Sequence, residues 1–132
     1  MSNCIYVTST HHGSGKTAIA LGLLGLLERH LGRVAYFKPI YQDAPGGLSA
    51  DVRLVKEALG LPYEVEEMCV VTHDEVGRAL AAGTYDAVLD QVYEAFVALR
   101  DKADFVVVEG TDYHGAMASF EFNINADLAK NL

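Results

Sequence analysis

Short, continuous apolar runs alternate along this chain with longer stretches in which apolar residues recur at helical spacing. The runs over 3–9 and 33–38 are rich in β-forming residues and predict strands, the second of which we expect to end before Pro39. A third strand is predicted over 104–109, where the unbroken apolar run is typical of a parallel strand that is buried on both faces. The weaker run over 66–71 predicts a short strand.

Helices are predicted between these strands. The segment 16–31 is rich in Ala and Leu and is followed by Gly32, a residue that favours the end of a helix. Ser49 is placed to cap a second helix, and Thr72 and Glu75 have the spacing of a capping box. The predicted helices span 16–31, 51–59, 73–82, 85–102 (capped by Thr84) and 123–132.

Strands that alternate with helices predict an α/β fold in which a doubly wound parallel sheet lies between layers of helices. In such folds the ligand binds at the carboxyl ends of the strands. We therefore expect three segments to converge: the loop after Ser9, the loop after Lys38, and Glu109 with the residues that follow it.

Composition and charge narrow the functions that this fold could have. The 132 residues fit one domain, and 18 acidic against 10 basic residues give a formal net charge of −8. That charge argues against a nucleic-acid surface and against an anionic membrane, although a local site could still bind a small anion. The apolar run over 18–27 is too short to span a membrane, and no secretory signal is visible, so a cytoplasmic protein is expected.

The clearest motif is Thr-His-His-Gly-Ser-Gly-Lys-Thr over 10–17, between a predicted strand and a predicted helix, which is the context of a P-loop. Backbone N–H groups of such a loop, together with the start of the helix, bind phosphate. We expect Lys16 to reach the phosphates and Thr17 to bind Mg²⁺. The alternative is a structural turn with a solvated lysine, because Thr10 replaces the first glycine of the usual motif. The other residues of this motif that we expect to bind phosphate are His12, Gly13, Ser14 and Gly15. For His12, a role as loop filler is an equal alternative.

Other polar residues stand at the tips of neighbouring elements. Lys38 either projects into the ligand crevice or is an ordinary edge lysine. Asp51 opens a helix, where a carboxylate also complements the helix dipole. Glu109 ends an apolar strand, and since a buried carboxylate needs a partner, we interpret it as a metal ligand, a base or part of a water-filled crevice. Thr17, Asp51 and Glu109 would together form an oxygen-rich shell for Mg²⁺.

The motif over 10–17, Phe-Lys-Pro-Ile over 37–40, the aspartate that opens the next helix and Val-Val-Val-Glu-Gly over 106–110 are together similar to the dethiobiotin-synthetase-like P-loop domains. This resemblance implies a P-loop NTPase-like three-layer α/β/α fold that binds ATP or another nucleotide. It further implies that Thr17, Asp51 and Glu109 hold Mg²⁺, and that Lys38 lines the site.

The whole chain resembles one branch of that superfamily, the N-terminal domain of long-form phosphate acetyltransferases. This likeness is carried by Phe-Lys-Pro-Ile-Tyr-Gln over 37–42, by the helical segment over 72–99 and by the final segment over 120–132. It implies that residues 1–132 are a nucleotide-binding regulatory or assembly domain. Its partner would be a C-terminal domain that moves acetyl groups between coenzyme A and phosphate, and this chain alone would lack that activity.

Two other functions stay open at this point. One is a free-standing ATP-dependent ligase of the dethiobiotin synthetase type, although the chain reads Thr-Asp-Tyr-His-Gly over 111–115 where the synthetase has small residues. The other is a P-loop sensor without chemistry.

A helix after a parallel strand normally leads to another strand, and the helix predicted over 123–132 is followed by none. We therefore expect an incomplete sheet edge and a homo-oligomer that forms through this edge or the terminal helix. The alternative is a monomer with a frayed C-terminus.

Overall fold

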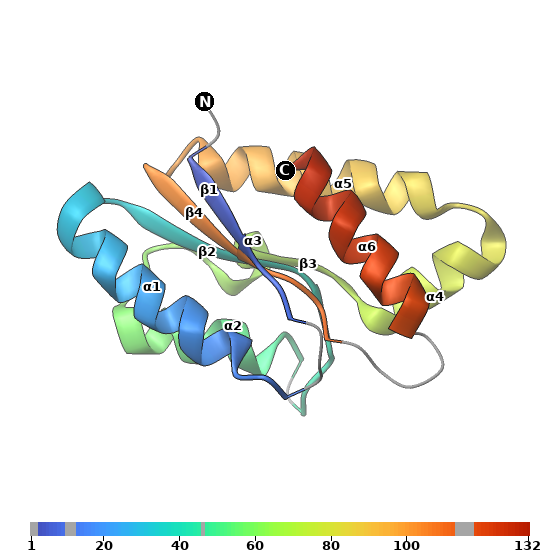
Figure 1. Cartoon of the computed structure of the whole chain (residues 1–132), viewed down its shortest axis with the longest axis horizontal. Helices are drawn as coiled ribbons and strands as arrows, with labels where there is room; N and C mark the ends of the chain where they lie inside the picture. The colour runs from blue at the N-terminus through green and yellow to red at the C-terminus, as the bar shows by residue number, and fades with distance from the viewer. Residues whose placement is uncertain (1–2, 10–12, 46, 113–117) are drawn as a thin grey trace.

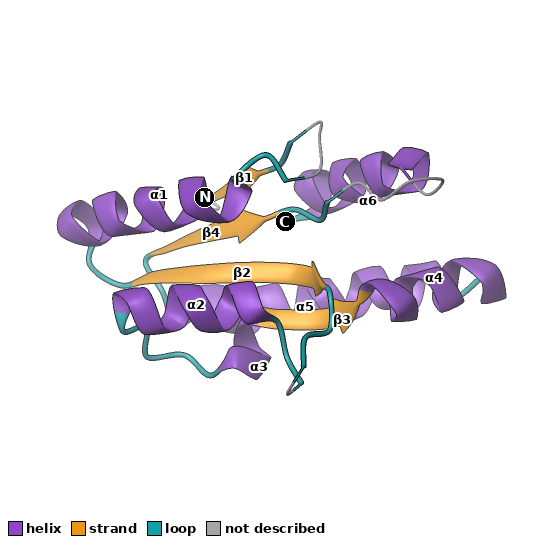
Figure 2. Cartoon of the chain, turned by 90° about the horizontal axis from the view of Figure 1, so that it is seen from below, coloured by secondary structure: helices purple, strands orange, loops and turns teal. Residues whose placement is uncertain are grey.

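The computed structural model describes residues 3–9, 13–45, 47–112 and 118–132. Its strands form one sheet in the order β1-β4-β2-β3, and each neighbouring pair is parallel. The predicted α/β fold with a parallel sheet flanked by helices is therefore confirmed (Figure 1 and Figure 2). The strands are β1 (Cys4–Val7), β2 (Val34–Tyr41), β3 (Cys69–Thr72) and β4 (Phe105–Glu109).

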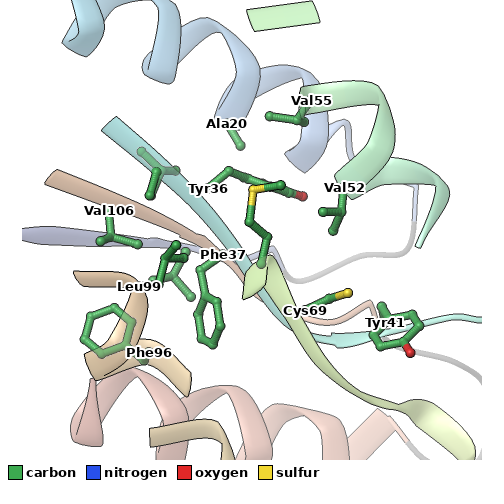
Figure 3. Packing of buried hydrophobic residues seen from close by; sticks show 14 of the residues in the cluster. Ala20, Tyr36, Phe37, Tyr41, Val52, Val55, Cys69, Phe96, Leu99 and Val106 are labelled. Atoms are coloured by element: carbon green, nitrogen blue, oxygen red, sulfur yellow. The ribbon is translucent and has the colours of Figure 1, made fainter. Parts of the chain in front are cut away.

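The helices cover both faces of this sheet. Helices α1 and α2 pack on one face, against β4 and β2, and α5 packs on the opposite face (Figure 3). Within the described ranges, none of these helices has the length and apolar character needed to cross a membrane. The helices are α1 (Lys16–Leu31), α2 (Ala50–Leu59), α3 (Val65–Met68), α4 (His73–Ala82), α5 (Tyr85–Arg100) and α6 (Ala118–Asn131).

The hydrophobic core is divided by the sheet, and strand β2 shows why. All eight of its residues are buried, and alternate side chains point to opposite faces. Tyr36 lies on the side of α1 and α2, whereas Phe37 packs against Phe96 of α5 with ring centroids 5.7 Å apart (Figure 3). A strand covered on both faces reads as a continuous apolar run, which explains the sequence of β4 as well.

The predicted end of β2 before Pro39 is wrong, because the strand continues to Tyr41. The ladder with β4 ends at the pair of Phe37 and Val108, and beyond it β2 is paired with β3 alone. Proline lacks an N–H group and is tolerated in a strand where one side has no ladder partner. The backbone can therefore stay extended through Pro39.

Other local details also differ from the prediction, among them the end of α5 at Arg100, two residues before the predicted end. Residues 65–68 form the short helix α3 before β3, where a strand was expected from residue 66, because Glu64 and Glu67 form a capping box that starts a helical turn. Thr84 does not cap α5 with its side chain, which donates instead to the carbonyl of Ala79 at 3.5 Å. Helix α6 begins at Ala118, five residues before the predicted start.

Several local predictions are confirmed. Helix α1 spans the predicted residues, Ser49 accepts a hydrogen bond from the backbone of Val52, and Thr72 and Glu75 form the capping box of α4. Strand β1 lies at one edge of the described sheet and β3 at the other. Self-association through an edge stays a prediction.

Candidate functional site

The chain order of the strands brings the predicted site residues together. Strand β4 enters the sheet between β1 and β2, so its carboxyl end lies between the loop that precedes α1 and the end of β2. These strand ends and the starts of α1 and α2 meet at one end of the sheet, at the lower centre of Figure 1. Parallel strands place their carboxyl ends at one edge, which is where α/β proteins bind ligands.

The described part of the loop before α1, residues 13–15, contains two glycines in a left-handed conformation. Gly13 and Gly15 have φ values of 69° and 82°, a left-handed conformation that glycine adopts without strain. Gly15 is also the N-cap residue of α1 and offers no side chain to accept from the first N–H groups of the helix. Gly13, Ser14 and Gly15 are exposed, so a phosphate could reach these N–H groups. Thr10 and His12 lie outside the described residues.

Lys16 is held at the first turn of α1 by polar partners. Its side chain is 5% exposed, and Nζ donates to Oγ of Ser9 at 3.3 Å and forms an ion pair with Asp112. Burial lowers the pKa of this ammonium group, and the negative charge of Glu109 partly opposes that effect. The lysine is therefore fixed between the end of β1 and the segment after β4.

Glu109 is the centre of the polar network and is only 1% exposed. Its Oε1 accepts hydrogen bonds from the Thr17 hydroxyl at 2.7 Å and from Lys38 Nζ at 3.2 Å. Its Oε2 accepts a hydrogen bond from the Tyr36 hydroxyl. Burial and the charge of Glu109 raise the pKa of Tyr36 well above its ordinary value, so the phenol stays protonated and remains a donor.

Lys38 points into the site, and its ammonium group joins two carboxylates. Nζ lies 2.6 Å from Oδ2 of Asp51 and 3.2 Å from Oε1 of Glu109. The Lys38 side chain is 10% exposed and that of Asp51 is 46% exposed, so the ion pair extends from the core to the surface. A buried ammonium of this kind is stabilised only because both carboxylates reach it.

The oxygen atoms around Lys38 suit a hard divalent cation. The Thr17 hydroxyl, Glu109 and Asp51 are linked through contacts of 2.6–3.2 Å. Within the described residues, no group of three or more His, Cys, Asp and Glu side chains could hold a metal by itself. Mg²⁺ is commonly bound by one or two carboxylates together with phosphate oxygens and water. The carboxylates of Glu109 and Asp51 and the Thr17 hydroxyl fit that requirement as oxygen ligands.

Sequence reasoning missed three residues of this network. Tyr36 shares a face of β2 with Lys38, and this spacing of two residues could have indicated it. Asp112 follows Glu109 by three positions in a segment interpreted only as a loop. Asn125 of α6, buried in the structure, could not be foreseen because its partners are distant in the sequence.

Asn125 fixes the segment that carries Asp112. Its Oδ1 accepts from the Tyr6 hydroxyl at 2.8 Å and from the backbone N–H of Thr111 at 3.0 Å, and its Nδ2 donates to the carbonyl of Thr111 at 3.0 Å. Gly110 precedes this clamp, where a Cβ atom would lie only 2.6 Å from Oδ1 of Asn125. The turn after β4 therefore requires both a residue without a side chain and a buried amide.

Two cavities open beside the network. One of about 270 Å³ is lined by Lys38, Asp51 and Asp112, among others. A larger cavity of about 730 Å³ is lined in part by residues of α4. The described residues that line it include none of the predicted phosphate- or metal-binding residues. His73 borders both cavities and its Nε2 lies 2.8 Å from Oγ1 of Thr111. The smaller cavity is the one connected with the candidate site.

Comparison with known proteins matches residues 3–132 to a family described as AAA domain. A phosphate acetyltransferase of Nitratidesulfovibrio vulgaris is 37% identical over 133 residues, which cover 100% of this chain and 19% of that protein. One of Synechocystis sp. is 34% identical with the same coverage, and one of Pseudomonas aeruginosa is 32% identical over 96% of this chain and 18% of its own length. The chain thus spans about a fifth of the length of these relatives.

Proposed function

The chain belongs to the AAA domain family and is homologous to the N-terminal domain of phosphate acetyltransferases, and on this premise we propose that it binds a nucleoside triphosphate, such as ATP, together with Mg²⁺. The observation that carries this proposal is the hydrogen bond of 2.7 Å between Thr17 and Glu109. It joins the hydroxyl that follows the P-loop lysine to the carboxylate at the end of β4. Both groups can supply oxygen ligands to Mg²⁺. They lie beside the start of a helix, which favours the binding of phosphate.

Each residue of the network has a role in this proposal. The backbone N–H groups before α1 and the ammonium of Lys16 hold phosphate oxygens. Thr17, Glu109 and Asp51 hold Mg²⁺, and Lys38, which contacts both carboxylates, keeps them near one another. When bound, the metal ion supplies positive charge that offsets the charge of the phosphates.

For the longer protein to which such a domain belongs, we propose a supporting role in acetyl transfer between coenzyme A and phosphate. The support is homology alone, since relatives named phosphate acetyltransferases match this chain over about a fifth of their length. The domain would regulate or assemble a partner domain that carries the acetyltransferase site. Nucleotide binding and this supporting role are separate proposals and need separate tests.

Calorimetric titration with ATP and Mg²⁺ tests the nucleotide proposal. Lys16→Ala removes a charge-assisted hydrogen bond to phosphate, which is worth about 1.5–3 kcal/mol, so we expect affinity to fall roughly tenfold to a hundredfold. Lys130→Ala is the matched control, because it removes the same charge from an exposed position in the last turn of α6. Equal affinities of the Lys16→Ala variant and the wild type would rule out the proposed phosphate site.

A further inference from the structure

Tyr36 buries a phenol hydroxyl, although its ring is packed among apolar side chains. The residue is 0% exposed, and its side chain lies between the sheet and the apolar side chains of Ala20, Val52 and Val55 (Figure 3). A phenylalanine would fill the same space, as Phe37 does on the opposite face. A buried hydroxyl costs free energy unless it is hydrogen-bonded. Packing alone therefore does not explain a tyrosine at this position, and the partner of its hydroxyl does.

That contact is with Glu109, and the sheet register explains how it forms. Tyr36 is paired with Val107 across the ladder between β2 and β4, and Glu109 lies on the same face two residues further along β4. Two residues of a strand span roughly 6.6 Å, which the long tyrosine side chain can bridge. Its hydroxyl donates to Oε2 of Glu109.

The two oxygens of Glu109 have different partners. Oε1 accepts from Thr17 and Lys38, both on the side of the candidate site, whereas Oε2 accepts from Tyr36 on the side of the core. No other described residue donates to Oε2. The phenol thus contacts the oxygen of Glu109 that faces the core, and the other oxygen faces the site.

We propose that Tyr36 is a positioning residue that orients Glu109 so that Oε1 is presented to the Mg²⁺ of a bound nucleotide. The proposal rests on the function proposed above. Partners that hydrogen-bond a metal-ligating side chain orient it, and their removal typically lowers metal affinity roughly tenfold to a hundredfold. Tyr36 would act on the metal-dependent part of nucleotide affinity only, since its described hydrogen bond goes to Glu109 and to none of the P-loop residues 13–17.

The test compares Tyr36→Phe with the wild type in ATP titrations, once with Mg²⁺ and once with EDTA. We expect the ratio of the two affinities to fall roughly tenfold or more in Tyr36→Phe, while the affinity in EDTA stays unchanged. Tyr41→Phe is the matched control, because it removes the phenol hydroxyl of another buried tyrosine in the same strand, and the described hydrogen bonds to Glu109 come from Thr17, Lys38 and Tyr36. A purely structural role of Tyr36 would lower the unfolding temperature without changing the ratio, and that result would overturn the proposal.

The outcomes separate the two proposals. If the wild type gains no affinity from Mg²⁺, the proposed metal site fails and the role of Tyr36 fails with it. If the wild type gains affinity and Tyr36→Phe gains as much, only the role of Tyr36 is wrong. A crystal structure of the wild type with Mg²⁺ and a non-hydrolysable ATP analogue tests the same point without a variant. We expect Tyr36 to remain bonded to one oxygen of Glu109 with the other toward the metal, and a Tyr36 hydroxyl bonded elsewhere would overturn the proposal.

Discussion

The hydroxyl of Thr17 lies 2.7 Å from Oε1 of Glu109, although 92 positions separate the two residues in the chain. Thr17 belongs to the first turn of α1, and Glu109 is the last residue of the inner strand β4. Their contact therefore joins the start of α1, directly after the P-loop, to the carboxyl end of β4. The interpretation of the site depends on this contact, because it brings the backbone that we propose binds phosphate next to a buried carboxylate.

Asp112 competes with phosphate for Lys16 in this interpretation. The carboxylate pairs with the Lys16 ammonium, and it must release that group before a phosphate can bind there. We therefore expect Asp112→Asn to bind ATP roughly three- to tenfold more tightly in calorimetric titration, since the ion pair is partly exposed. Asp90→Asn, an exposed position on α5, serves as the control. Weaker binding by Asp112→Asn would mean that Asp112 helps to hold the ligand.

Gly110 is predicted to be intolerant of any side chain. A Cβ atom there would lie 2.6 Å from Asn125 Oδ1 and 2.9 Å from Cε1 of Tyr6. We expect Gly110→Ala to lower the free energy of unfolding in urea by about 1–3 kcal/mol, the usual cost of overpacking. Gly22→Ala is the contrasting variant, because this exposed glycine of α1 has free space and alanine should stabilise the helix by about 0.5–1 kcal/mol. Gly110→Ala as stable as the wild type would contradict the role given to this turn.

Acid should weaken the ion pair between Arg33, which precedes β2, and Asp104, which precedes β4. Asp104 accepts hydrogen bonds from the backbone and the side chain of Arg33, and the side-chain bond, followed by the backbone bond, lowers the pKa of this carboxyl below its ordinary value. A lowered pKa in the folded state means that the stabilisation is present above about pH 4 and is lost as the pH falls through the folded-state value.

Urea unfolding of the wild type and of Asp104→Asn from neutral to acid pH measures this effect. We expect the difference in stability between the two proteins to shrink below about pH 4. Asp90→Asn, at an exposed position on α5, is the matched control. A difference that stays constant with pH would show that the Asp104 charge does not act in this way.

The chain alone is predicted not to transfer acetyl groups between coenzyme A and phosphate. It matches about a fifth of the length of its phosphate acetyltransferase relatives, and the other four-fifths of those relatives lie outside the match. Spectrophotometric assay of the purified chain with acetyl-coenzyme A and phosphate measures this directly. Turnover well above that of a buffer blank would contradict the assignment as a supporting domain.

Much of the fold could be predicted because its signals are local. The start of α1 after Gly15, the cap at Ser49 and the apolar run of β4 each depend on a few neighbouring residues. The error at the end of β2 arose because pairing across the sheet overrides local chemistry. Pro39 stays in β2 because the ladder with β4 has already ended, which the sequence of β2 does not reveal.

The candidate site was predictable in its parts but not in its connections. Lys16, Thr17 and Glu109 stand at element ends, where their chemistry is unusual for the local pattern. The partners of these residues, Tyr36 and Asp112, are separated from them by 73 and 96 positions and depend on the strand order. The alternation of side chains along β2 places Tyr36 on the same face as Lys38, but its hydrogen bond to Glu109 depends on which strand lies next to β2.

The central claim is that this end of the sheet binds a nucleotide with Mg²⁺ held by Glu109. Calorimetric titration of ATP into the wild type and into Glu109→Gln, each with Mg²⁺ and with EDTA, tests it most directly, with folding checked by circular dichroism. We predict that the wild type binds ATP more tightly with Mg²⁺ than with EDTA, and that Glu109→Gln loses most of this difference while still binding in EDTA. A folded wild type that binds no ATP in either condition, or a Glu109→Gln variant that keeps the full Mg²⁺ effect, would contradict the claim.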